Sequence, residues 1–246
     1  MKTAVFMKTA LFALFCLAIL PAHAQQKKSV TPPPARKPPA PPTGATPMLY
    51  DGHPDLQGVW VLSGSPNLPS DPAFTPAAKK LYDERKATKG KDDPESICLP
   101  DGLVRMTPLP YKIVQSPKMV VLLSEGNTHS YRRFFLDGRP HNLDLDPNTY
   151  TGDSTGKWDG NTLVVDTIGF NDKTWLDATG KPHSEDLHVV ERYHRPDLGH
   201  LNIQYTLEDK TSFTKPYTFE RTFTLAPGWE LQEYVCQAIL DGVIKP

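Results

Sequence analysis

The sequence has no excess of positive charge. It contains 27 Lys and Arg residues against 28 Asp and Glu residues, a formal net charge of −1. Because nucleic acids are bound by neutralising their phosphates with Lys and Arg, this balance argues against a DNA or RNA partner. Long hydrophobic runs are also lacking. The apolar run from Ala10 to Leu20 is too short to cross a bilayer and no later run is long enough, so we expect no transmembrane segment.

The first 24 residues have the order of a secretory signal. Lys2 and Lys8 precede the apolar run, and Ala22-His23-Ala24 supplies a small-x-small cleavage site. We therefore expect residues 1–24 to be removed on export to the periplasm or the extracellular space. Removal takes two lysines and no acids, which leaves 27 − 2 = 25 basic against 28 acidic residues, a net charge of −3.

Cysteine is scarce, with three residues in the chain. Cys16 leaves with the signal, so Cys98 and Cys236 remain, and an even count in an oxidising compartment predicts a disulfide between them. The alternative is a pair of free, buried thiols. The histidines and cysteines show no zinc-type spacing and no His-Glu-x-x-His motif, so we expect neither a metal nor another cofactor.

Proline is concentrated in residues 25–47, which carry few apolar side chains. Such a stretch cannot bury enough surface to fold, and we expect a disordered, partly polyproline linker. The remaining residues, 48–246, are long enough for a single domain with its own core. A helix is predicted near residues 76–89, with Thr75 as its cap, Pro76 in its first turn and Gly90 at its end.

Most of the other segments have the composition of short strands separated by turn residues. Asn, Asp and Gly in the short connections are typical of hairpins. We therefore predict an all-β fold, an antiparallel meander that closes into a calycin-like barrel because closure removes exposed edges. The predicted strands are 57–63, 111–115, 118–124, 129–136, 162–168, 187–195, 200–207, 217–225 and 230–236.

Alternation within these strands places charged residues on apolar faces. Arg221 alternates with Phe219 and Phe223, and Glu191 lies between Val189 and Tyr193. By the same rule, Arg133 alternates with Tyr131 and Phe135, Asp166 follows Val164, and Tyr205 lies on the inner face of its strand. Charges in an apolar interior must be paired. They form either an internal ion-pair network, Arg221 or Arg133 with Glu191, or the polar floor of a ligand pocket.

Three further patterns suggest chemistry. Gly152-Asp153-Ser154-Thr155-Gly156 matches a nucleophile elbow, but no helix follows the serine, so a glycine-rich loop is the better interpretation and a serine hydrolase the weaker one. Asp144–Asn148 imitates the start of a calcium loop without its glycine and closing glutamate. His183, at the mouth of a strand, is expected to titrate near neutrality.

Two resemblances accompany these patterns. Gly58-Val59-Trp60 resembles the Gly-x-Trp element of the first lipocalin strand, where the tryptophan plugs the barrel floor. Several strings between Cys98 and Cys236 resemble an uncharacterised family of exported bacterial proteins, which implies export and a β-rich barrel but no catalytic role. These strings are Arg132–His141, Gly152–Asn171, Trp175–Asp177, Gly180–Ser184 and Leu187–Arg192.

The function predicted from these features is the binding of a small, partly apolar molecule. Arg133, Glu191 and Arg221 would form the polar floor, and Trp175, Tyr131 and Tyr205 would contribute to the ligand site. The alternative is a metal-independent lyase, isomerase or hydratase on the same barrel, with Glu191 as base, Arg133 as electrophile, and His183 and Asp166 assisting. A purely structural module is a third interpretation.

Overall fold

A computed structural model describes residues 36–106, 109–126, 128, 130–144 and 148–237. The predicted signal peptide and the first part of the predicted linker lie outside this range. The described chain forms nine strands, one α-helix and a short 3₁₀ helix. In chain order they are β1 Gly58–Ser63, α1 Pro76–Ala87, η1 Pro94–Ile97, β2 Tyr111–Ser116, β3 Met119–Ser124, β4 Tyr131–Phe135, β5 Asp153–Asp159, β6 Thr162–Ile168, β7 His188–His194, β8 His200–Glu208 and β9 Tyr217–Leu225.

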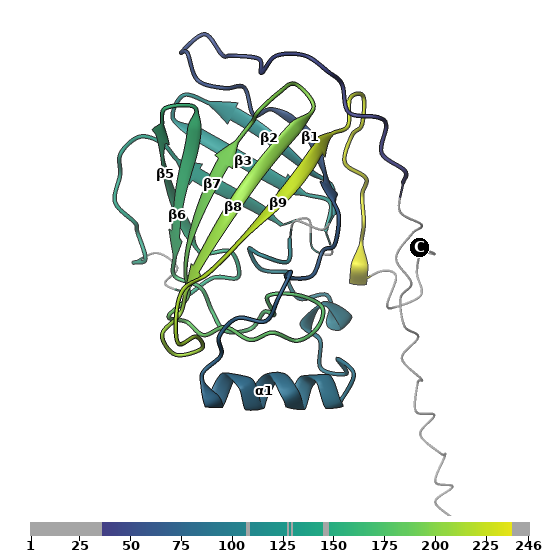
Figure 1. Ribbon diagram of the computed structural model, residues 1–246, viewed down its shortest axis with the longest axis vertical. Coiled ribbons are helices and arrows are strands. Elements are labelled where there is room, and N and C mark those ends of the chain that lie inside the picture. Colours follow the sequence, from purple (N-terminus) through teal and green to yellow (C-terminus); the bar gives the residue numbers. More distant parts are fainter. Residues whose placement is uncertain (1–35, 107–108, 127, 129, 145–147, 238–246) are drawn as a thin grey trace, which may run out of the picture.

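The strands close into a single barrel in sequence order, with β9 pairing back onto β1 (Figure 1). The fold is therefore an all-β barrel, calycin-like in general kind, as the sequence predicts. One junction departs from the predicted meander: β4 and β5 are parallel, and only Phe134–Ser154 and Phe135–Thr155 pair across it. Parallel neighbours need a crossover connection, which here is the long segment between Phe135 and Asp153.

Two predicted elements differ from the structure. Gly152–Gly156, predicted as a glycine-rich loop, lies in strand β5 from Asp153 onward, because β5 pairs along its whole length with β6. Residues 230–236, predicted as a strand, are not in the sheet. The barrel is already closed by β1 and β9 and offers this segment no free edge. Instead the segment carries Cys236 to Cys98, and the predicted disulfide between them is confirmed.

The helix agrees with its sequence signals. Thr75 caps it by accepting a hydrogen bond from the Ala78 amide, Pro76 occupies its first turn, and Gly90 follows its end with a φ of 72°. Ala78 and Tyr82 are its buried residues. The helix lies across one end of the barrel, called the base here (Figure 1).

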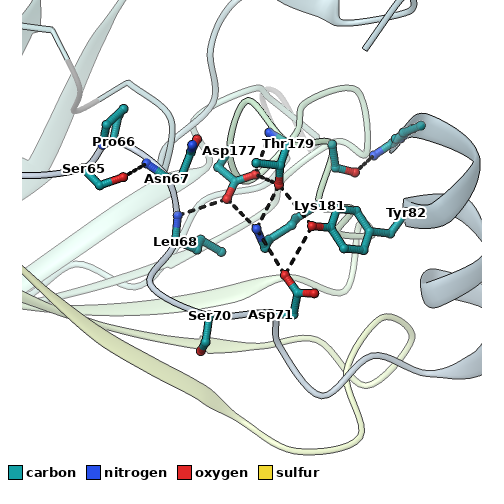
Figure 2. A network of polar contacts seen from close by, with 12 residues as sticks. Ser65, Pro66, Asn67, Leu68, Ser70, Asp71, Tyr82, Asp177, Thr179 and Lys181 are labelled. Carbon is teal, nitrogen blue, oxygen red and sulfur yellow. Dashed lines mark hydrogen bonds and ion pairs between the residues drawn. The ribbon is translucent and has the colours of Figure 1, made fainter. Parts of the chain in front are cut away.

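The base is held together by a buried ion pair outside the barrel strands. Asp177 and Lys181 are 1% and 4% exposed, and Lys181 Nζ lies 2.9 Å from Asp177 Oδ2. The same carboxylate oxygen accepts from the Leu68 amide, and Lys181 also lies 3.3 Å from Asp71 (Figure 2). Tyr82 donates to Asp71, so the network connects α1 to two loops beneath the barrel.

The opposite end is closed around Trp60, which is fully buried. Its indole donates to the Leu56 carbonyl, and the Arg195 guanidinium lies 5.0 Å from the ring centroid. Arg195 also donates to the carbonyls of Asp55, Asp197 and Leu198. A bulky indole held between these groups fills the end of a small barrel.

Part of the predicted linker is bound to the domain. Residues 36–47 pass over the end that Trp60 closes (Figure 1), and Leu198 and Arg195 form hydrogen bonds with Gly44 and Thr46. At the start of the described chain, Arg36 forms an ion pair with Glu125. Each contact satisfies a polar group of the barrel or its loops, which explains why this proline-rich stretch follows the domain surface. Among the described residues, no helix is long and apolar enough to cross a membrane.

Candidate functional site

A charged pair lies inside the barrel, and its acid was predicted correctly. Glu191 projects inward from β7 and is fully buried, as the alternation of Val189, Glu191 and Tyr193 predicts. Its partner is Arg132 of β4, whose side chain is 1% exposed. Two hydrogen bonds of 3.0 and 2.5 Å join the guanidinium to both carboxylate oxygens, and the Tyr193 hydroxyl donates to Oε1 at 2.9 Å.

Two hydroxyls complete this arrangement, which we call the interior polar cluster. Ser154 of β5 and Thr167 of β6 each accept from Arg132 at 3.3 Å and lie 2.9 Å from one another. The cluster thus comprises Arg132, Ser154, Thr167, Glu191 and Tyr193, and it spans four strands. Bidentate geometry and additional hydroxyl contacts are what a charge pair needs in a dry interior.

The electrostatics of the cluster follow from its burial. Burial alone would lower the pKa of Arg132, but the charge of Glu191 raises it above its ordinary value. Burial, reinforced by the same carboxylate, raises the pKa of Tyr193. Both oxygens of Glu191 are engaged, by the Arg132 guanidinium and the Tyr193 hydroxyl. A carboxylate in this state is poorly suited to abstracting a proton.

Arg221 also projects into the barrel, as predicted, but it does not pair with Glu191. Its guanidinium donates to the Val104 and Pro66 carbonyls, both at 2.6 Å, and so joins β9 to the loops at the base. Burial lowers its pKa. Tyr205 is on the inner face as predicted, stacked on Phe219 at 4.8 Å between ring centroids. These side chains fill the lower part of the barrel with aromatic and guanidinium groups.

The sheet is weakest between β4 and β5, and a cleft of about 410 Å³ opens there. Below the two paired positions, β4 and the chain leading into β5 separate. Arg132 and Ser154 of the interior polar cluster are among the lining residues, so the cleft extends from the surface to that cluster. The lining residues are Pro100, Thr128, Ser130, Tyr131, Arg132, Arg133, Phe135 and Thr149–Ser154.

The prediction that Arg133 and Tyr131 face the interior is wrong. Arg132 and Phe134 of β4 are buried, whereas Tyr131 is 56% exposed and Arg133 is on the outer face. Pairing with β3 decides which face of β4 points into the barrel. Arg132 pairs with Leu122 and Phe134 pairs with Val120, and both of these β3 residues are fully buried. Tyr131 and Arg133 nevertheless line the cleft from the outside.

Asp166 is also on the outer face, contrary to its predicted place. It alternates with the buried Val165 and Thr167 and lies between two histidines, with His141 Nε2 and His188 Nε2 each 2.8 Å from its oxygens. Burial would raise the pKa of Asp166, but hydrogen bonds from His188 and His141 lower it. This histidine-bridged carboxylate was not predicted, since the sequence separation of its members exceeds 20 residues.

His183 and Trp175 are buried beneath the barrel and do not lie on an open rim. His183 is 7% exposed and lies 2.7 Å from Thr174 Oγ1 and 3.1 Å from the Ser184 carbonyl. Burial lowers its pKa, so the neutral ring is favoured and the expected titration near neutrality is not supported. Trp175 is 4% exposed and contacts the guanidinium of Arg85.

The four predicted catalytic residues therefore do not form a site together. Glu191 is inside the barrel, Arg133 and Asp166 are outside it, and His183 is at the base. Ser154 belongs to a strand that another strand follows, which is not an elbow. Of the calcium-like segment, residues 145–147 lie outside the described chain, and no group of His, Cys, Asp or Glu in the described part is suited to a metal ion.

No protein-family model matches the chain, and no curated protein is similar to it.

Proposed function

We propose that this chain is an exported protein that binds a small, partly apolar molecule in the cleft between β4 and β5. The observation that carries the proposal is the separation of these two strands, which opens about 410 Å³ down to Arg132 and Ser154. That volume lies within the range of small-molecule sites, and the combination of aromatic rings with a few polar groups is typical of their lining. The disulfide and the signal-like start of the sequence support export.

The position of the ligand differs from the one expected from the sequence. Large side chains occupy the barrel interior, with Trp60, Tyr111, Tyr193, Tyr205, Phe134 and Phe223 all fully buried. Both ends of the barrel are covered, one by Trp60 and Arg195 and the other by α1 and the base loops. A side entrance at the β4–β5 junction is the remaining way to bring a ligand against the interior polar cluster. The engaged oxygens of Glu191 favour binding over proton transfer by that residue.

A thermal-shift screen with a cleft-filling variant tests the proposal. Compounds of one or two rings carrying a carboxylate, hydroxyl or amide are screened against the wild type, Thr151→Trp and Gln204→Trp. Thr151 lines the cleft, whereas Gln204 is exposed on the outer face of β8. Compounds that stabilise the wild type and Gln204→Trp but not Thr151→Trp are expected. If no compound stabilises the wild type, or if every effect survives Thr151→Trp, the cleft is not a binding site and a structural role is favoured.

A further inference from the structure

Two neighbouring arginines reach the same cleft from opposite faces of β4. Arg132 belongs to the interior and Arg133 to the outer surface, and both are lining residues. Such an arrangement arises because successive strand residues point to opposite faces while the strand itself borders the opening. The cleft therefore has a guanidinium at its inner end and another at its mouth.

The inner arginine has an unused donor. Its two terminal nitrogens bind Glu191, Ser154 and Thr167, but the buried Nε atom has no hydrogen-bond partner among the described residues. Buried N–H groups without a partner are rare in native proteins. An acceptor entering through the cleft would satisfy this donor without disturbing the bonds to Glu191.

Arg133, the outer arginine, contacts two aromatic rings and forms no ion pair with an acidic side chain of the described residues. The Arg133 guanidinium lies 5.8 Å from the Tyr131 ring centroid and 5.5 Å from that of Phe135, and no ion pair to it is found within the described part of the chain. By contrast, the exposed Arg192 on β7 pairs with Asp159 at 2.8 Å. Arg133 thus presents a positive charge to the mouth of the cleft.

One carboxylate also lines the cleft, but it is engaged elsewhere. Asp153 Oδ2 lies 3.0 Å from His141 Nδ1 and accepts from the Asn142 amide at 3.1 Å, so it fastens the segment between β4 and β5 to the barrel. It is the single acid among the lining residues. The rest of the lining supplies apolar surface through Tyr131, Phe135, Tyr150 and Pro100.

We infer that the ligand is a monocarboxylate with an apolar, ring-sized body. Its carboxylate would accept a hydrogen bond from Arg132 Nε at the inner end of the cleft, the Arg133 guanidinium at the mouth would attract the anion, and its body would contact the aromatic side chains there. Arginine is suited to this role because a guanidinium offers several donors in a fixed plane that matches a carboxylate. The inference rests on the proposed function and adds the charge and class of the ligand to it.

Isothermal titration with matched probes tests the inference. The probes are 2-naphthoate, its neutral analogue 2-naphthylmethanol, and acetate, which carries the charge without the body. We expect the wild type at pH 7.5 and low salt to bind naphthoate at least about tenfold more tightly than the alcohol, and acetate more weakly than either, because charge-assisted hydrogen bonds are stronger than neutral ones. Arg133→Gln should weaken naphthoate binding about tenfold and leave the alcohol unchanged.

Arg192→Gln is the matched control, since it removes an exposed arginine on another strand. Arg133→Lys keeps the charge and should retain part of the affinity. Equal affinity for acid and alcohol, or equal effects of Arg133→Gln and Arg192→Gln, would overturn the inference while leaving small-molecule binding intact. If neither probe binds but the screen yields neutral ligands of the cleft, the anion inference fails alone. If the screen yields no ligand, the proposed function fails with it.

Discussion

Replacing Arg132 with methionine tests whether the interior charge pair is as dry as its geometry indicates. The substitution leaves Glu191, which is fully buried, without its cation. Removing one partner of a buried pair typically costs about 3–5 kcal/mol, because the remaining charge is uncompensated. Here the Tyr193 hydroxyl still donates to Glu191, and Ser154 and Thr167 can still bond to each other. We therefore expect the lower part of that range, about 3 kcal/mol.

Urea unfolding with the disulfide intact measures this loss. Arg133→Met is the matched control, since it removes the neighbouring arginine from the outer face and should change the free energy of unfolding by about 0.5 kcal/mol or less. The double variant Arg132→Met/Glu191→Gln removes the stranded charge but keeps an amide oxygen for Tyr193. It should recover about 2 kcal/mol of the loss.

If Arg132→Met unfolds within about 1 kcal/mol of Arg133→Met, or if the double variant recovers nothing, the reasoning about an uncompensated buried charge is refuted.

Three further predictions concern the surroundings of the cleft and the base. Replacing Cys98 and Cys236 with serine opens a loop of 138 residues and should lower the free energy of unfolding by up to about 5 kcal/mol in chemical denaturation; no change would mean that the bridge restrains only the chain end. Burial raises the pKa of Asp101 to about 6, with Arg105 opposing and Asp93 reinforcing the shift. Because the folded-state pKa is raised, this contribution to the free energy of unfolding is full below the unfolded value near 4 and is lost as the pH rises through 6. Asp101→Asn should therefore remove up to about 3 kcal/mol of pH-dependent stability between these two values. If the pH dependence of the free energy of unfolding is unchanged in the variant, other groups cause it. Gly152 has a φ of 70°, and a Cβ there would lie 2.7 Å from the Ile168 carbonyl oxygen, so Gly152→Ala should lower the free energy of unfolding by about 1–3 kcal/mol. Gly138 has a φ of 76° with open space around it, so Gly138→Ala should lower the free energy of unfolding by less. Equal losses in the two variants would argue against the close contact at Gly152.

The sequence predicts the later strands of the barrel better than the earlier ones, and the reason is physical. In β8 the apolar residues fall on alternate positions, and in β7 and β9 Glu191 and Arg221 each lie between apolar residues at alternate positions, so the inner positions of Glu191, Tyr205 and Arg221 follow from the pattern alone. In β4 both faces carry aromatic rings, so alternation cannot choose between Arg132 and Arg133. The choice depends on pairing with β3 and on a distant carboxylate, neither of which is visible in a five-residue segment.

The cleft itself has no local sequence signature. It exists because β4 and β5 are parallel and pair at two positions, while Asp153–Asp159 is drawn into the sheet by its pairing with β6. The composition of Gly152–Gly156 suggests a loop, and its pairing with β6 makes most of it a strand. Conversely, the disulfide between Cys98 and Cys236 is predicted correctly because these are the two cysteines left after the expected signal peptide, and their pairing needs no knowledge of the fold.

The most direct test of the ligand site is a crystal structure of the protein with 2-naphthoate. We expect the naphthoate to lie between β4 and β5, with its carboxylate within hydrogen-bonding distance of Arg132 Nε and its rings against Tyr131. A structure in which the naphthoate lies elsewhere, or in which its carboxylate faces bulk water away from both arginines, would contradict it.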